Sequence, residues 1–296
     1  MDRADAVGQS GNSFSRMLGG VRRRLQNRFR HMPCLCDISH TMPLTDIRPL
    51  PCARRRMNMF YLIDTSGSMN HNGCIESVNE AMPEIIEILR DVTLGNKDYG
   101  EIFVNCIAFS NRARLLEPMP VSALDYSWSN LEAYGLTNMG EAFDLLDAQL
   151  RPEAALGATA GNLRPAVILL SDGDPDSGWE SHLESLRENP WFADSYKIAI
   201  AIGAAPDKVA MRKAISEFTA IGGKGSVISV TDMGKLTEVI RTVSATVSRI
   251  ASRARVRTET GTETVDSQIH AGISAALEPL DGVDIPAIAP DSPFWD

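Results

Sequence analysis

Five oxygen-bearing side chains stand at positions from which they could hold a metal ion together. They comprise two carboxylates and three hydroxyls, with neither a cysteine nor a histidine among them. Carboxylate and hydroxyl oxygens are hard donors, which suit Mg²⁺ or Mn²⁺ better than zinc. Three hydroxyls, with waters held by the two carboxylates, would leave one octahedral position open for a carboxylate of a partner. The five residues are Asp64, Ser66, Ser68, Thr137 and Asp172.

Two predicted strands end directly in front of these residues. The apolar run 59–63 precedes Asp64, and the apolar run 166–170 leads through a serine to Asp172. Thr137 stands at the start of a predicted helix. Doubly wound sheets place their ligands outside the carboxyl ends of their strands. We therefore expect the five side chains to meet at one edge of a sheet.

Strands alternate with helices along residues 57–256. The strand signals are continuous apolar runs, which favour a parallel sheet covered on both faces. The first helix has apolar residues at steps of 3, 4, 3 and 4 from Ile75 to Leu89, and Pro83 within it predicts a kink. The predicted fold class is α/β, a Rossmann-like three-layer α/β/α sandwich with a mostly parallel central sheet. The predicted strands are 59–63, 102–109, 113–116, 166–170, 197–202 and 227–230, and the predicted helices are 75–89, 139–150, 179–187, 207–220 and 233–250.

Charge divides the chain into three segments. Residues 1–56 form an Arg-rich arm that we expect to be partly ordered, and residues 257–296 an acidic tail that we expect to be flexible. The formal net charge of −9 argues against general nucleic-acid binding. Only the arm, with apolar residues at helical spacing from Phe14 to Phe29, suits a polyanion, a membrane surface or a partner's groove. The tail ends in Pro-Phe-Trp-Asp, either a partner-docking motif or a frayed terminus.

The five cysteines form no recognisable disulfide framework. Together with the absence of a signal-peptide pattern and of an apolar run of about 18 residues, this predicts a cytoplasmic protein. Cys34, Cys36, His40 and Cys52 form an alternative set for zinc. The single residue between Cys34 and Cys36 is awkward for two zinc ligands, so free or packed thiols are the competing interpretation.

The stretch Asp64-Thr65-Ser66-Gly67-Ser68 resembles the DxSxS motif of von Willebrand factor A (vWA) domains. Thr137 and Asp172 resemble the separate threonine and aspartate that complete the metal-ion-dependent adhesion site (MIDAS) of that family. The resemblance covers residues 58–250. It implies that Ser66, Ser68 and Thr137 bind the metal directly and that the two aspartates act largely through water. It also implies a partner protein that offers an Asp or Glu to the metal.

Two further stretches narrow the resemblance. GLTNMGEA and LSDGDPDSGW are similar to sequences in small bacterial vWA proteins of the tellurite-resistance type. That likeness implies a place in a stress-response or defence signalling system, with a protein kinase or phosphatase of the same system as partner. Some relatives of this type carry a cysteine-rich metal-binding segment after the vWA domain. This chain departs from them, because no cysteine follows Cys106.

Other interpretations of the same residues remain open. The DxSxS stretch could be a capped turn, because Asp and Ser are common helix N-caps. A metal-dependent phosphoester hydrolase is a second function, but a phosphatase with Asp64 as nucleophile would need an acid at the position of Ser66. An aspartic protease would need Asp-Thr-Gly, but Ser66 stands where the glycine should be, and a serine hydrolase would need GxSxG, which the sequence around Ser66 lacks. A scaffold acting through the arm and the tail is the third function. We expect no enzymatic activity.

Overall fold

The fold is built on strand β1 (Arg55–Asp64), which lies in the middle of the sheet with every residue from Met57 to Asp64 buried. The computed structural model describes residues 55–95, 100–151, 162–203, 208–223, 225–252 and 264–285. All of them belong to one compact unit, within Ala53–Asp296. The predicted Arg-rich arm up to residue 54, its cysteines and the Pro-Phe-Trp-Asp terminus lie outside the described residues. No helix that the structure describes is long and apolar enough to cross a membrane.

The described strands form one sheet in the order β3-β2-β1-β5-β6-β7-β8, with β4 also paired to β2. The five inner strands run parallel, and the pairings of β3, β4 and β8 are antiparallel. This is the mixed, mostly parallel sheet that the apolar runs predict. The remaining strands are β2 (Gly100–Phe109), β3 (Ala113–Leu115), β4 (Val121–Ser122), β5 (Ala166–Ser171), β6 (Tyr196–Ile202), β7 (Gly225–Val230) and β8 (Val283–Asp284).

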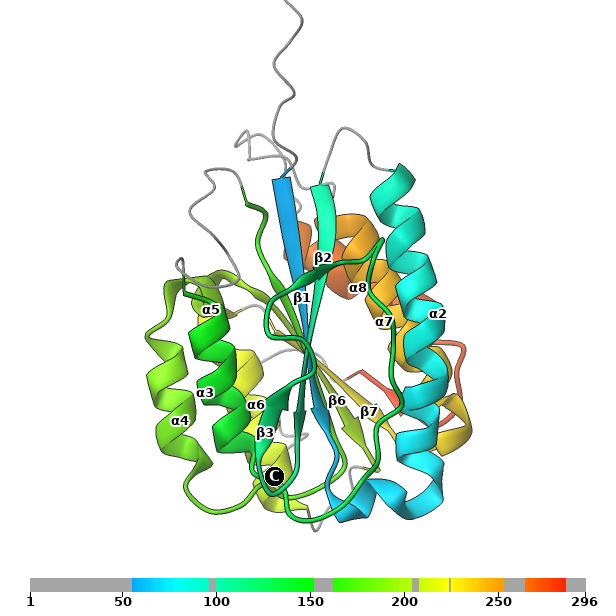
Figure 1. The fold of residues 1–296 in the computed structure, drawn as a ribbon. Coiled ribbons are helices and arrows are strands. Elements are labelled where there is room, and N and C mark those ends of the chain that lie inside the picture. Colours follow the sequence, from blue (N-terminus) through cyan, green and yellow to red (C-terminus); the bar gives the residue numbers. More distant parts are fainter. Residues whose placement is uncertain are drawn as a thin grey trace, which may run out of the picture. The chain divides into compact units, whose positions relative to one another are not determined.

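Helices cover both faces of the sheet (Figure 1). On one side pack α3 (Met139–Gln149), α4 (Trp179–Arg187), α5 (Pro190–Asp194) and α6 (Val209–Ala220). On the other side pack α2 (Cys74–Gly95), α7 (Leu236–Ala251) and α8 (Val265–Leu277). Alternate residues of β1 enter the two cores: Tyr61 and Ile63 face the α2 side, and Phe60 and Leu62 face the α3 side. Burial on both faces explains why β1 is a continuous apolar run.

Helix α2 continues through Pro83, where the sequence predicts a kink. Pro83 is exposed, whereas Met82 and Ile85 on either side of it are buried. The backbone group that loses its partner at a proline can therefore be satisfied by water on the outer side of the helix. The helix starts near the carboxyl end of β1 and runs the length of the sheet (Figure 1).

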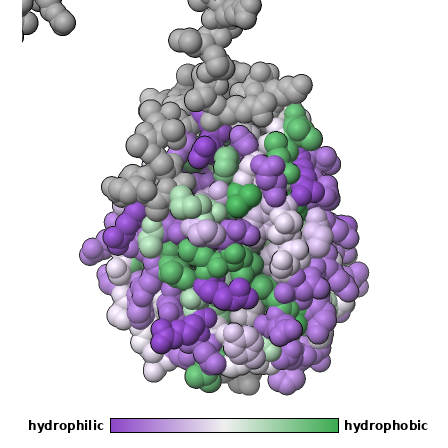
Figure 2. Space-filling view, in the orientation of Figure 1, coloured by the Kyte–Doolittle hydropathy of each residue, from purple (hydrophilic) through white to green (hydrophobic). Residues whose placement is uncertain are grey.

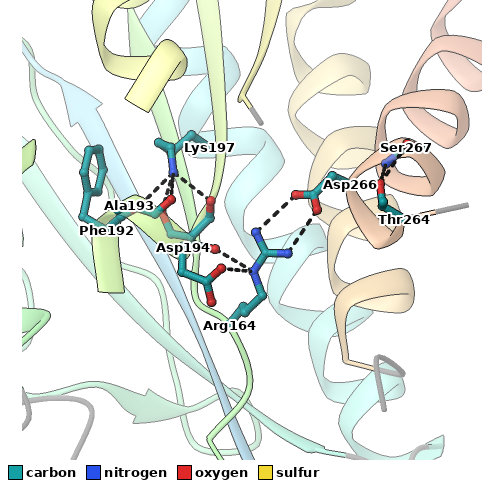
Figure 3. Close-up of polar contacts among 9 residues, drawn as sticks. Arg164, Phe192, Ala193, Asp194, Lys197, Thr264, Asp266 and Ser267 are labelled. Carbon is teal, nitrogen blue, oxygen red and sulfur yellow. Dashed lines mark hydrogen bonds and ion pairs between the residues drawn. The ribbon is translucent and has the colours of Figure 1, made fainter. Parts of the chain in front are cut away.

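Part of the segment predicted as a flexible tail is ordered. Residues 264–285 contain α8, which packs on α7 through Ile269, Ile273 and Leu277, and β8, which pairs with β7. Arg164 holds the start of α8, because its guanidinium donates to both carboxylate oxygens of Asp266 at 3.1 and 3.2 Å (Figure 3). The expectation of a flexible segment from residue 257 is thus wrong for residues 264–285. The three buried residues lie four apart, which is a helical spacing. The Ser, Thr and Asp content of residues 257–296 as a whole gave no sign of this short helix.

The surface around these layers is mainly hydrophilic on the face drawn in Figure 2, with a group of hydrophobic residues near its centre. Among the described residues, six large apolar side chains are markedly exposed: Leu94, Met119, Leu124, Tyr134, Leu136 and Val209.

Candidate metal centre

The strand order places a topological switch point at the carboxyl ends of β1 and β5. From β1 the chain passes through α2 to β2 on one side of β1, and β5 pairs with β1 on the other side. Connections that diverge from neighbouring strands leave a gap between their loops, and this switch point is where open α/β sheets bind ligands. The loop after β1 carries Asp64, Ser66 and Ser68, and the loop after β5 carries Asp172.

Asp64, the last residue of β1, lies at this switch point and has no exposed surface. Its Oδ1 accepts a hydrogen bond from the backbone N–H of Ser66 at 2.8 Å, and its Oδ2 accepts one from Ser171 Oγ at 2.6 Å. Burial raises the pKa of the Asp64 carboxyl from 3.8 to about 6, although these hydrogen bonds favour the charged form. Ser171 was not predicted as part of the site, since a serine at the end of an apolar run gives no sign of its hydrogen-bond partner.

Ser66, Ser68 and Asp172 form a continuous chain of hydrogen bonds. Ser66 Oγ and Ser68 Oγ lie 3.0 Å apart, and Ser68 Oγ donates to Asp172 Oδ1 at 2.7 Å. Ser66 and Asp172 are 2% and 6% exposed, so little of either side chain reaches solvent. The loops after β1 and β5, about a hundred residues apart in the sequence, are thus joined through their predicted metal ligands.

The three hydroxyl groups surround one small space beside Gly173. A Cβ atom on Gly173 would lie 3.3 Å from Ser68 Oγ, 3.4 Å from Thr137 Oγ1 and 3.9 Å from Ser66 Oγ. Glycine leaves that space free, and all three oxygen atoms border it. The structure therefore brings Thr137 to the same place as the serines, as the sequence predicts. We name the space bordered by these three hydroxyls the hydroxyl cradle.

Backbone hydrogen bonds hold the Thr137 loop against the loop after β1. The N–H of Gly67 donates to Gly135 O at 3.0 Å, and the N–H of Tyr134 donates to Thr65 O at 2.8 Å. Gly135 has a φ of +80°, which favours glycine at this turn. Asn138 caps α3 by accepting from the N–H of Glu141 at 3.1 Å. The cradle thus depends on backbone contacts that fix its walls.

The donors at this edge fit a hard divalent cation. Among the described residues, no three His, Cys, Asp or Glu side chains gather in a way that could hold a metal ion. A metal bound here would depend on the three hydroxyl oxygens, supported by Asp64 and Asp172. Mg²⁺ and Mn²⁺ accept such oxygen ligands and commonly keep waters. The geometry of the hydroxyl cradle and the chemistry of its oxygen donors therefore both fit a cation such as Mg²⁺ or Mn²⁺.

Two charged neighbours of the cradle are already engaged. Lys208, immediately before α6, donates from Nζ to the backbone carbonyl of Asp172. Asp174 accepts from the N–H of Met211 at 2.7 Å, so its Oδ1 binds the first turn of α6.

Cys74, buried at the start of α2, contacts Met233 through sulfur atoms 3.6 Å apart. The proposed zinc set Cys34, Cys36, His40 and Cys52 lies outside the described residues.

Comparison with known proteins supports the fold. No family model matches the chain, and neither does any curated protein. Among solved structures, the chain is similar to a von Willebrand factor type A protein from Catenulispora acidiphila, at 21% identity over 66% of this chain and 43% of that one, with a TM-score of 0.48. It is similar to the pilus adhesin SpaC from Lactobacillus rhamnosus GG, at 13% identity over 68% and 31%, with a TM-score of 0.52.

A third similar structure is proximal thread matrix protein 1 from the mussel byssus, solved with its MIDAS motif occupied by zinc. It is 15% identical over 67% of this chain and 47% of its own, with a TM-score of 0.45. The chain spans less than half the length of each of these three proteins. At such identities the likeness concerns the fold alone. The predicted fold class, an α/β vWA-like fold with a mostly parallel sheet, is confirmed.

Proposed function

We propose that this protein is a metal-dependent protein-binding module. Ser66, Ser68 and Thr137 would hold a divalent cation, with Asp64 and Asp172 supporting it through water. When bound, the cation would offer a coordination position to an Asp or Glu of a partner protein. The observation that carries the proposal is the hydroxyl cradle, in which three hydroxyls from two separate loops border one space beside Gly173. Two buried carboxylates, Asp64 and Asp172, accept hydrogen bonds from Ser66 and Ser68 of the same cradle.

The charges at the cradle support binding of an acidic group. Two carboxylates balance one divalent cation, so the loaded site is close to neutral and an incoming carboxylate meets little net repulsion. Asp64, whose pKa is raised to about 6 by burial, gains a compensating positive charge when a cation binds. The chain's own residues thus favour a cation first and a carboxylate second.

We also propose a biological setting for this protein. The stretches GLTNMGEA and LSDGDPDSGW support a bacterial stress-response or defence system of the tellurite-resistance type, with a protein kinase or phosphatase as the partner. We place the protein in the cytoplasm on the same grounds and on its scattered cysteines. Mg²⁺ and Mn²⁺ are the proposed metals.

We propose no catalytic activity. A hydrolase with Asp64 as nucleophile would need a proton donor close to it, and the side chain two residues later is Ser66. Ser66 Oγ is within hydrogen-bonding distance of Ser68, and the contacts of Asp64 are a serine hydroxyl and a backbone N–H. These contacts hold the carboxylate in place and supply no general acid.

A pull-down from bacterial cytoplasm tests the proposal. Wild type with Mg²⁺, wild type with EDTA and the variant Ser66→Ala/Ser68→Ala serve as baits. Ser181→Ala/Ser185→Ala is the matched control, because it removes two serine hydroxyls from the exposed face of α4. We expect one partner to be retained by wild type and the control in Mg²⁺ and lost in the other two samples. Equal recovery from all four samples would assign binding to another surface.

A further inference from the structure

Three exposed apolar side chains stand on segments that carry or contact the hydroxyl cradle. Of the six large apolar residues exposed in the described part of the chain, three adjoin segments that contact the cradle. Tyr134 is 57% exposed, Leu136 is 63% exposed and Val209 is 61% exposed. A single exposed apolar residue needs no explanation, but a group of them around a polar site is typical of an interaction surface.

Tyr134 and Leu136 are held beside the cradle by their backbones. The N–H of Tyr134 donates to Thr65 O at 2.8 Å, and that of Leu136 donates to Asn111 Oδ1 at 2.9 Å. Gly135, between them, accepts from Gly67, and Thr137 directly after them supplies a cradle hydroxyl. The backbone of this loop is thus fixed while its two apolar side chains point away from the core. A fixed loop loses little conformational entropy when a partner covers it.

Val209 is the first residue of α6, whose first turn is bonded to the loop after β5 through the N–H of Met211 and Asp174 Oδ1. It follows Lys208, whose ammonium donates to the carbonyl of Asp172, the residue that accepts from Ser68. Val209 therefore adjoins the loop after β5, as Leu136 adjoins the loop that carries Thr137. We name Tyr134, Leu136 and Val209 the apolar rim. Lys208 adds one positive charge at the same border, which favours a carboxylate as the central contact of a partner.

We propose that the partner offers a single carboxylate with large apolar residues close to it in the sequence, and that these residues pack on the apolar rim. The inference rests on the proposed function and adds to it the chemistry of the partner segment. Charge supports a single acid over an acidic stretch, because the protein's own net charge is −9 and repels acid-rich segments at long range. Binding energy at protein interfaces comes mainly from buried apolar and aromatic anchors, which the rim supplies.

A peptide library displayed on phage tests this inference, with random peptides of about twelve residues, a length that suits recognition of a short segment. The full-length protein is immobilised in Mn²⁺ buffer, and bound phage are eluted with EDTA. The rim variant carries Tyr134→Ser, Leu136→Ser and Val209→Ser. The matched control is Leu94→Ser, since Leu94 is 57% exposed but lies at the far end of α2. Leu136→Ser alone serves if the triple variant does not fold.

We expect EDTA to elute peptides from wild type that contain an Asp or Glu with a large apolar residue within two positions, enriched at least threefold over the starting library. The rim variant should still select the acid and lose the apolar enrichment, whereas Leu94→Ser should behave as wild type. Acid selection without apolar neighbours on wild type, or apolar enrichment that persists on the rim variant, would overturn this inference alone. If EDTA elutes no acid-bearing peptides from wild type, the proposed function fails and this inference fails with it.

Discussion

Two buried charges at opposite ends of the sheet are treated differently by their surroundings. Lys197 stands near the start of β6, at the amino end of the sheet, and is 1% exposed. Its Nζ donates to Phe192 O and Ser195 O at 2.8 Å each and lies 5.0 Å from the centre of the Phe192 ring (Figure 3). Asp64 ends β1 at the carboxyl end, is fully buried and accepts two hydrogen bonds.

The difference separates a structural charge from a functional one. Backbone carbonyls, which carry no net charge, solvate the Lys197 ammonium and hold it in place. Asp64 has no cation among its hydrogen-bond partners, another carboxylate, Asp172, lies nearby, and burial raises its pKa to about 6. One end of the sheet is therefore complete within the protein, and the other gains from an added cation. Stability should depend on the first end under all conditions, whereas the second end should govern metal binding and make stability depend on pH and on metal.

The largest expected effect follows from removing the structural charge. Lys197→Met leaves buried carbonyls such as Ser195 O without their charged donor, and hydrogen bonds to charged groups contribute about 1.5–3 kcal/mol each. We expect the free energy of unfolding to fall by about 3 kcal/mol, measured by urea denaturation, with Mn²⁺ affinity unchanged. Lys213→Met, at a half-exposed lysine in surface ion pairs, should cost less than about 1 kcal/mol. Similar losses for the two variants would contradict a structural role for Lys197.

The second prediction concerns the pH dependence of the metal-free protein. The pKa of Asp64 is about 6 in the folded state and 3.8 in the unfolded state, so between these values the folded state retains a proton that the unfolded state has lost. Stability from this group is therefore present at low pH and is lost as pH rises through about 6, by on the order of 3 kcal/mol. Asp64→Asn removes this dependence. In EDTA the variant should become more stable than wild type as pH rises from about 4.5 to 7.5.

Metal should offset that difference. At pH 7.5 with Mn²⁺ at about a hundred times its dissociation constant, wild type gains about 2.7 kcal/mol from binding the folded state, and Asp64→Asn gains much less. The measurement is urea unfolding of both proteins in EDTA and in Mn²⁺. If wild type is the more stable protein in EDTA at pH 7.5, or if metal stabilises both equally, Asp64 is a structural carboxylate like many others.

The sequence predicts the parts of the molecule whose signals are local or follow from strand order. The apolar runs before Asp64 and Asp172 reveal β1 and β5, and the rule that ligands lie at the carboxyl ends of strands brings the predicted residues together. Their hydrogen bonds and the hydroxyl cradle agree with that prediction. Their role in binding metal stays a prediction, tested by the experiments above.

The missed features depend on contacts between distant segments. Ser171 matters because Asp64 accepts its hydrogen bond, and Lys197 is buried because α5, only five residues long, turns its carbonyls towards it. Neither partner can be inferred from the residues next to it in the sequence. Helix α8 was missed because it stands between polar segments and its charged contact, Arg164 with Asp266, joins positions about a hundred residues apart. Composition alone predicts whether a segment is ordered only when that segment does not pack on a distant part of the chain.

The smallest expected effect tests the hydroxyl cradle itself. In Gly173→Ala the new methyl group would lie 3.3 Å from Ser68 Oγ and 3.4 Å from Thr137 Oγ1, close enough to displace a water or an ion without striking backbone. We expect about tenfold weaker Mn²⁺ binding by calorimetry, equivalent to about 1.4 kcal/mol, and a change in unfolding free energy below about 1 kcal/mol. Gly95→Ala is the matched control, because no atom lies within 4 Å of its added Cβ and it stands at the far end of α2. Unchanged metal affinity in Gly173→Ala would mean that the space between the hydroxyls is not where the cation binds, and the comparison between the two ends of the sheet would then concern stability alone.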